Sequence, residues 1–289
     1  MLLFRTLFVL VCTLSFSLFA SQAFVTVKRC DVAPQIDAEL VDDAWNNALE
    51  ISNFIVLRED AIAAERQSQF YLTYDDEYLY IAFRCFEEML NPVLNQSENF
   101  KALGKNHDEQ EIWRDDIVEI FLAPDANNSQ HYFHLAINAN AAIWDTIGMG
   151  QAEQWNGVYK KEAKTFVDQI SGDIKKSAGW SCEIAIQLKS LGVEKIQEGD
   201  EWKANFCRVA RTVDETSSWA QTTGRFHDPG SFGKIVFKEN NAATKKISSM
   251  SELKNGSNEF SGEKKSNTEI ILEAHFSNGD IVEFKDTDV

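Results

Sequence analysis

Several short segments of the chain alternate hydrophobic and polar residues with a period of two. In Tyr78–Arg84, the residues Leu79, Ile81 and Phe83 fall on one face, which is typical of a half-buried β-strand. Similar alternation or apolar runs predict six further strands, at Phe70–Tyr74, Ile117–Leu122, His131–Asn138, Trp180–Gln187, Glu201–Ala210 and Phe232–Phe237. Loops rich in Asp, Asn, Ser and Gly separate them.

Helical pattern is confined to a turn within Asp42–Leu49 and a second at Lys189–Leu191. Many short strands with so little helix indicate an all-β fold. We therefore expect an antiparallel β-sandwich of about ten strands, with jelly-roll or immunoglobulin-like layers and short helical turns.

The first 23 residues differ from the rest. They carry a single charge at Arg5, an apolar run over Leu7–Leu14, and the small residues Ser21 and Ala23. This layout is typical of a secretory signal peptide cleaved after Ala23, and the apolar run is too short for a membrane anchor. We expect a secreted protein, extracellular or periplasmic, with no membrane span after residue 24.

The remaining chain divides into three parts. Residues 24–237 form the predicted sandwich domain, and residues 238–267, rich in Asn, Ser, Lys, Glu and Gly, are expected to be a flexible linker. Residues 268–289 are expected to form a hairpin or tail, because Glu269–Phe276 and Ile281–Phe284 flank an Asn278-Gly279 turn signal.

Composition narrows the range of partners. The chain has 45 acidic and 28 basic residues, a net charge of −17, which repels nucleic acids and anionic membrane surfaces. Seven acidic residues lie between Asp108 and Asp125, around Trp113. The 20 Phe, 7 Trp and 6 Tyr suit a β fold, since aromatic rings pack well on a pleated sheet.

Export would leave four cysteines, at positions 30, 85, 182 and 207, in a compartment where disulfides persist. Three pairings are open, and free buried thiols are equally compatible with the strand-like runs around three of them. No CxxC or CxxH spacing indicates a zinc site.

The tryptophans fall into two groups. Trp45, Trp180 and Trp202 are best explained as core residues, at a helical turn and at strand starts. Trp144 and Trp155 flank a loop at residues 148–150 that could wall a binding face, and the role of Trp219 is open.

A series of motifs runs through the chain in a fixed order: PQIDAELVDDAW (34–45), LTYDDEYLYIA (72–82), WRDDIVEIF (113–121), WSCEIAI (180–186), WKANFCR (202–208), SW (218–219) and DPGSFG (228–233). Together they resemble the family 9 carbohydrate-binding modules and related sandwiches, over about residues 30–237. The order of the motifs carries the resemblance, since each motif alone is weak.

The resemblance implies a sandwich that binds sugars, commonly glucose- or xylose-type chain ends, between two aromatic side chains, with structural calcium. Trp113 matches one stacking aromatic, and Phe226 lies where the family has the second, usually a Trp. Glu119 matches a carboxylate that accepts hydrogen bonds from sugar hydroxyls, and His134 lies near a family arginine that also contacts the sugar.

The chemistry of these residues agrees with the resemblance in part. A pyranose presents C–H groups on its faces and hydroxyls around its edge, so aromatic planes with nearby acceptors suit it. Trp113 could instead be a core aromatic at a strand start, although the charged residues around it indicate a polar setting. Glu119 lies between Ile117 and Phe121 on one face of the strand, so its charge needs either an ionic partner or contact with water. A buried salt bridge to Arg208 is therefore the alternative to a sugar-binding role.

Calcium requires several oxygen ligands. The resemblance places Glu87 at a calcium-ligand position that is usually Asp. The other candidates are Asp37, Glu39 and Glu88, and solvated surface charge is the alternative for each of them.

Other functions are less well supported. Asp115, Asp116 and Glu119 cluster, but no catalytic motif accompanies them, so we predict that the chain is not an enzyme. A haem-binding electron-transfer sandwich is an alternative, with candidate axial ligands at Met89, Met149, His131 and His134, and a protein-interaction or adhesion domain is another.

The sequence therefore predicts a secreted, non-catalytic carbohydrate-binding module with a polysaccharide or oligosaccharide ligand. Such a module would serve polysaccharide-degrading glycoside hydrolases.

Overall fold

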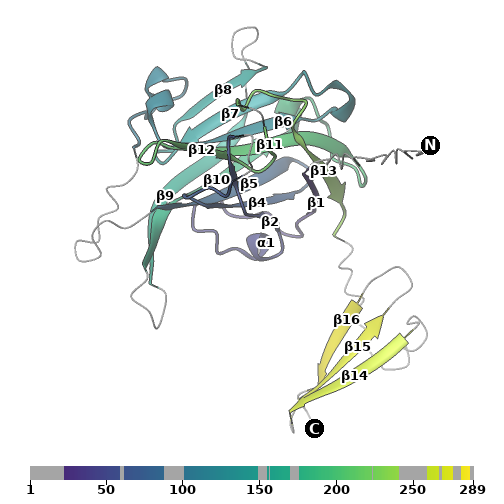
Figure 1. Ribbon diagram of the computed structural model, residues 1–289. Helices are drawn as coiled ribbons and strands as arrows, with labels where there is room; N and C mark the ends of the chain where they lie inside the picture. The colour runs from purple at the N-terminus through teal and green to yellow at the C-terminus, as the bar shows by residue number, and fades with distance from the viewer. Residues whose placement is uncertain are drawn as a thin grey trace, which may run out of the picture. The chain divides into compact units, whose positions relative to one another are not determined.

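The computed structural model describes residues 23–58, 62–87, 101–148, 155, 157–169, 176–222 and 224–240, together with the backbone of three strands beyond residue 258. The chain forms two compact units, residues 1–239 and residues 240–289. The first unit is a two-layered β-sandwich, with an eight-stranded sheet lying over a five-stranded sheet (Figure 1).

The eight-stranded sheet has the order β1-β13-β11-β6-β7-β8, and β12 and β3 extend it beside β11. β1 and β13 are parallel, whereas the other neighbouring pairs are antiparallel. Its strands are β1 (Phe24–Lys28), β3 (Ile55–Val56), β6 (Ile117–Ala123), β7 (Phe133–Asn138), β8 (Ile143–Ile147), β11 (Glu201–Ala210), β12 (Glu215–Ser218) and β13 (Gly233–Lys238).

The five-stranded sheet is antiparallel, in the order β2-β4-β5-β10-β9. Its strands are β2 (Leu49–Ile51), β4 (Ser68–Tyr74), β5 (Tyr78–Glu87), β9 (Tyr159–Gln169) and β10 (Lys176–Gln187). Short helical turns complete the unit: α1 (Asp43–Asn46), η1 (Gln110–Arg114), η2 (Ala126–Asn128) and η3 (Leu188–Leu191). The predicted all-β sandwich with short helical turns is confirmed.

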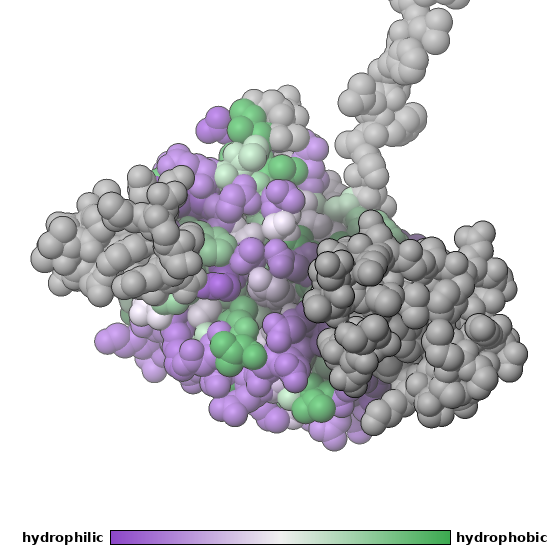
Figure 2. Space-filling model, turned by 90° about the horizontal axis from the view of Figure 1, so that it is seen from below, coloured by the Kyte–Doolittle hydropathy of each residue, from purple (hydrophilic) through white to green (hydrophobic). Residues whose placement is uncertain are grey.

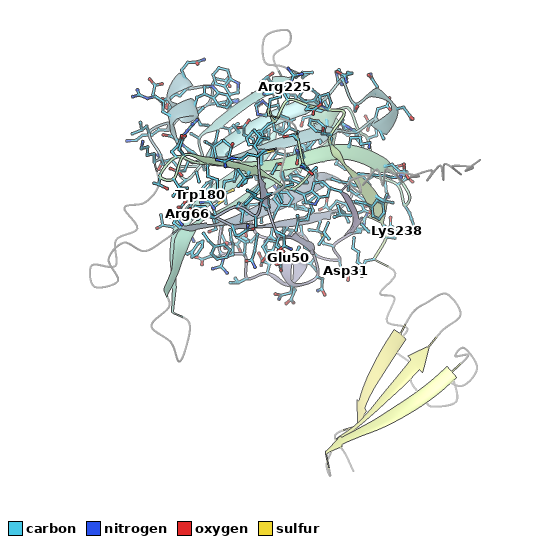
Figure 3. The ribbon with its side chains drawn as sticks, viewed as in Figure 1. Asp31, Glu50, Arg66, Trp180, Arg225 and Lys238 are labelled. Carbon is cyan, nitrogen blue, oxygen red and sulfur yellow. The ribbon has the colours of Figure 1, made fainter. Side chains whose placement is uncertain are left out.

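The alternating faces of the predicted strands meet between the two sheets. Leu79, Ile81 and Phe83 of β5 are fully buried in the main core. The alternate residues of β6, β7 and β10 join them there, including Val118, Leu135 and Trp180. Figure 3 labels Trp180 at the level where the two sheets face each other. Alternation therefore identified correctly which face of each strand is buried.

A buried ion pair joins the two sheets. Arg208 of β11 is 1% exposed and contacts the carboxylate of Glu87 at the end of β5, whose side chain is fully buried. The Arg208 Nη1 group also donates to the backbone oxygens of Gln67 (2.9 Å) and Phe86 (3.1 Å). Arg208 pairs with Val118 across the sheet and shares its inward direction, whereas Glu119 points outward. The alternative for Glu119, a buried salt bridge to Arg208, is therefore wrong.

The outer face of the five-stranded sheet is covered by α1 and the loop before it. Trp45 of α1 packs with Tyr80 and Ala82 of β5 in a small separate cluster. Figure 2 views the molecule from this side and shows mainly hydrophilic residues, with hydrophobic ones scattered among them. The apolar surface of this sheet is thus largely buried by local packing.

Glu183 of β10 anchors that loop. It is fully buried, and its carboxylate accepts hydrogen bonds from the backbone N–H groups of Asp37 (2.8 Å), Ala38 (3.0 Å) and Leu40 (3.0 Å). Ala38 and Leu40 have positive φ angles of 61° and 54°, a conformation that L-residues adopt at a cost. The carboxylate holds the loop in this conformation.

Glu183→Gln is expected to destabilise the sandwich by about 1–3 kcal/mol. The glutamine amide group would face a backbone N–H donor and leave it unpaired. Urea denaturation measures the loss, and Glu162→Gln is the matched control, because Glu162 is exposed and directly opposite Glu183 on β9. Equal stability of the two variants would contradict the anchoring role.

The four cysteines at positions 30, 85, 182 and 207 are all buried and free. The alternative in which they pack as small hydrophobic residues therefore holds in this structure. Among the residues that the structure describes, no helix is long and apolar enough to cross a membrane. The predicted signal peptide, residues 1–23, lies outside the described residues apart from Ala23.

The second unit contains an antiparallel sheet in the order β14-β15-β16, formed by β14 (Glu259–Ser266), β15 (Glu269–His275) and β16 (Ile281–Asp286). The expected hairpin segments correspond to β15 and β16, and its turn lies outside the described residues. β14 falls within residues 238–267, which were expected to be a linker. Its sequence, EFSGEKKS, has no apolar alternation from which a strand could be predicted.

Candidate functional site

The outer face of the eight-stranded sheet carries most of the predicted site residues. The register pairs Phe121 of β6 with His134 of β7, and Glu119 with Ala136, which in turn pairs with Trp144 of β8. Because successive side chains of a strand alternate, these residues share the face that points away from the main core. Ala136 is small, so little side chain stands between Glu119 and Trp144.

Trp113 lies on η1, the helical turn that leads into β6. Its ring is partly exposed and meets the ring of Trp144 edge-on, with 5.6 Å between centroids, and lies 6.1 Å from the ring of His134. The Nη2 group of Arg211 donates to the Trp113 backbone oxygen at 2.6 Å. Two partly exposed indoles therefore stand side by side at the edge of the site.

The acidic residues that follow Trp113 do not form a rim around it. Asp115 and Asp116 are both fully buried. Asp115 accepts hydrogen bonds from the N–H groups of Leu103 (2.7 Å) and Gly104 (2.9 Å), and Asp116 accepts one from the N–H of Arg211 (2.9 Å). They fix the loop before η1 and the turn after β11, so their charge shapes the site indirectly. The polar surroundings predicted for the Trp113 ring are therefore not supplied by Asp115 and Asp116.

Glu119 and His134 contact each other directly. The Glu119 Oε2 and His134 Nε2 atoms are 2.8 Å apart, and the two residues are 6% and 2% exposed. The ring of His134 also stacks on Phe121, 4.4 Å away and within 5° of parallel. The two polar residues that the resemblance placed at the site are thus one hydrogen-bonded pair, with the imidazole held in a fixed plane.

Phe226 packs into the apolar floor of this site. It is 8% exposed and belongs to the cluster around Phe121, with 6.5 Å between the two ring centroids. Its position next to the site agrees with the sequence-based prediction. A ring this deeply buried supports neighbouring side chains, however, and offers little surface of its own as an opposite wall.

Sequence reasoning missed His227, the residue after Phe226. Its Nδ1 lies 2.9 Å from the hydroxyl of Tyr132, and its ring meets His134 edge-on at 4.7 Å. Burial, with His134 alongside, lowers the pKa of His227 to about 4, so the ring is neutral at pH 7. The signal in the sequence was only its place beside Phe226.

Arg225 was also missed. It is exposed, and Figure 3 labels it at the top of the sandwich, over the eight-stranded sheet. The segment Arg225–His227 therefore offers a cationic side chain, a buried ring and a neutral imidazole to the same face.

The other tryptophans are distributed as follows. Trp45, Trp180 and Trp202 are buried, as predicted. Trp155 packs on Phe133 in the main core and donates from Nε1 to the Ser190 backbone oxygen at 2.7 Å, so it walls no binding face. Trp219 is partly buried against Phe206.

The two residues predicted as calcium ligands lie on opposite sides of the five-stranded sheet. Glu87 points into the sandwich and pairs with Arg208. Asp37 lies in the outer loop, where its carboxylate accepts from the Gln35 Nε2 group (3.1 Å) and the Glu39 N–H (2.9 Å). They therefore do not fit one shared calcium ion. Glu39 pairs with Lys164, and Glu88 lies outside the described residues.

Among the described residues, no catalytic site and no haem-binding site is assembled. Asp115 and Asp116 accept hydrogen bonds from backbone N–H groups, and Oε2 of Glu119 contacts His134. His134 is also the haem-ligand candidate nearest the site, while Met89 and Met149 lie outside the described residues. His131 is exposed and packs edge-on against Phe133.

Comparison with solved structures identifies the fold. A protein from Bacteroides uniformis ATCC 8492, described as a candidate carbohydrate-binding protein, aligns with 75% of this chain and 99% of its own at a TM-score of 0.55 and 16% identity. Two structures of a family 9 carbohydrate-binding module from Caldicellulosiruptor kristjanssonii, in complex with cellotriose and with glucose, align at TM-scores of 0.48 and 0.47. Both are 21% identical and cover 76% and 75% of this chain and 97% and 96% of their own. No curated protein matches the chain.

The β-sandwich fold and the family comparison together define a carbohydrate-binding module. The family model described as "Carbohydrate family 9 binding domain-like" matches residues 36–240, and the chain belongs to this family. Its members are non-catalytic binding modules. The resemblance read from the ordered motifs is therefore confirmed.

Proposed function

We propose that the chain binds the ring of a neutral sugar on the outer face of the eight-stranded sheet. The observation that carries this proposal is the pair of partly exposed indoles of Trp113 and Trp144, 5.6 Å apart, next to the Glu119–His134 pair. Indoles supply apolar area for the C–H faces of a pyranose, and the carboxylate accepts hydrogen bonds from its hydroxyls.

The arrangement changes the assignment of the two aromatic partners. Trp113 remains the main stacking surface, as the family resemblance implies. Phe226 lies in the floor of the site, so Trp144, which stands beside Trp113, is the better candidate for the second aromatic contact. The hydrogen bond from His134 orients the Glu119 carboxylate, and Arg225 is available as a donor to sugar oxygens at the exposed side.

We also propose the setting of this activity. The N-terminal segment indicates export, and a non-catalytic module of this family would then deliver polysaccharide-degrading hydrolases to their substrate or hold oligosaccharide products outside the cell. The strong negative charge of the chain favours neutral polysaccharides over acidic ones, since like charges repel.

Titration calorimetry of the full chain tests the proposal. The panel comprises soluble β-glucan, xylan and mannan, their short oligosaccharides, and a polyuronate as the acidic comparison. We expect saturable binding of at least one neutral glycan and none of the polyuronate. Absence of binding across the whole panel would contradict sugar recognition, and preferential binding of the polyuronate would contradict the role given to charge.

A further inference from the structure

Three potential metal ligands converge within the candidate site. Glu119 comes from β6, His134 from β7 and His227 from the segment between β12 and β13, and one ligand atom from each lies within 4.8 Å of the others. Glu119 and His134 are buried, and His227 is partly buried. A carboxylate and two imidazoles form a donor set that zinc and other divalent transition metals favour.

The hydrogen bond between Glu119 and His134 marks where an ion would sit. The Oε2 and Nε2 atoms are 2.8 Å apart, whereas two ligands of a tetrahedral zinc ion are separated by about 3.4 Å. A small outward movement of the two side chains would therefore place both at coordinating distance. The ion would take the place of the proton that the two atoms now share, and this proton would leave to solvent.

His227 is already held in the manner of a metal-bound histidine. Its Nδ1 atom faces the hydroxyl of Tyr132 at 2.9 Å, which leaves Nε2 as the free ligand atom. Metal-bound histidines generally use their second nitrogen in a hydrogen bond of this kind, which fixes the tautomer and the plane of the ring. The ring of His134 is likewise fixed, by its stacking on Phe121.

We infer that Glu119, His134 and His227 form a binding site for a divalent transition-metal ion, with zinc as the best match. Three protein ligands leave a fourth position for water or for a ligand hydroxyl. The inference goes beyond the proposed function, because it concerns an ion and can be tested without a sugar. If both hold, the metal and the sugar occupy adjoining positions and each changes the affinity of the other.

A second group of ligand atoms provides the comparison. His107, Asp108 and Asp145 also lie within 4.8 Å of one another. His107 and Asp108 are exposed, however, and the group contains a single imidazole. We expect this group to bind zinc more weakly than Glu119, His134 and His227. Its exposed ligands must be ordered on binding, and it supplies one imidazole where the other group supplies two.

The test is calorimetric titration of zinc into the full chain, freed of metal with a chelator and dialysed into a non-coordinating buffer, with no sugar present. We expect one-to-one binding that weakens at least about tenfold in His227→Ala and in Tyr132→Phe, and that weakens as the pH falls. His107→Ala is the matched control and should leave the affinity unchanged. Cobalt(II) added in place of zinc should give the visible absorption of a tetrahedral site, which His227→Ala removes.

Three results would overturn the inference. The first is no saturable zinc binding by the wild type. The second is binding that His227→Ala leaves unchanged while the circular dichroism of the variant matches the wild type, and the third is binding that His107→Ala abolishes. Because His227→Ala could disturb local packing, His227→Gln, which keeps a partner for Tyr132, is measured alongside. Sugar titrations on the metal-free protein report separately on the proposed function.

Discussion

Replacement of Trp113 with alanine is expected to weaken sugar binding by about 2 kcal/mol or more, which is roughly a 30-fold loss of affinity or greater. The indole of Trp113 is partly exposed and meets the ring of Trp144 edge-on. Its removal takes away the largest apolar contact available to a pyranose face at this site. Titration calorimetry with the best glycan of the panel measures the loss.

The variant should remain folded. Trp113 lies on the short turn η1, outside the strands, and packs only at the margin of the cluster that includes Phe121. Asp115 and Asp116, which fix the neighbouring loops, are untouched. Urea denaturation should therefore show a stability loss well below the 3–5 kcal/mol of a fully buried tryptophan.

Trp219→Ala is the matched control for this experiment. Trp219 is also a partly buried tryptophan, but it packs against Phe206 on the side of the main core. We expect it to lose some stability and to bind the glycan with wild-type affinity. Unchanged affinity in Trp113→Ala, or an equal loss in both variants, would show that Trp113 does not carry the stacking contact.

The strands that could be predicted are those whose two faces differ. β5, β6, β7 and β10 bury one apolar face in the main core, and alternation therefore located both the strand and its orientation. β9 is an edge strand with the sequence YKKEAKTFVDQ, in which charged residues stand where a central strand would need apolar ones. Polar edges protect a sheet against further pairing, and for the same reason they give no strand signal.

The site was only partly predictable. The order of motifs singled out Trp113 and Glu119, and the structure brings both to one face together with His134. The pairing of Glu119 with His134 instead of Arg208 follows from cross-strand register, which no local pattern states. His227 reaches the site through a loop from a distant part of the chain, and the burial of Asp115 and Asp116 depends on how the loops close. Residue spacing therefore predicts neither the position of His227 nor the burial of the two aspartates.

The largest stability effect is expected from Arg208→Met. Removal of the guanidinium leaves the buried Glu87 carboxylate with only the more distant Arg66, whose Nε lies 3.7 Å away. Loss of one member of a buried ion pair typically costs about 3–5 kcal/mol. The backbone oxygens of Gln67 and Phe86 also lose a donor, which adds to the cost. Urea denaturation should show a midpoint far below that of the wild type.

The double variant Arg208→Met/Glu87→Leu shows how much of that stability loss comes from the buried charge of Glu87. Because it removes both ions, it should recover part of the stability. The backbone oxygens that lose the Arg208 donor should keep it below the wild type. Lys234→Met is the surface control, since its partner Glu201 is exposed and such pairs contribute about 0–1 kcal/mol. If the double variant were as unstable as Arg208→Met alone, Glu87 would have to stabilise the fold through a group other than Arg208. Arg66, whose Nε lies 3.7 Å from the Glu87 carboxylate, is then the group to replace next.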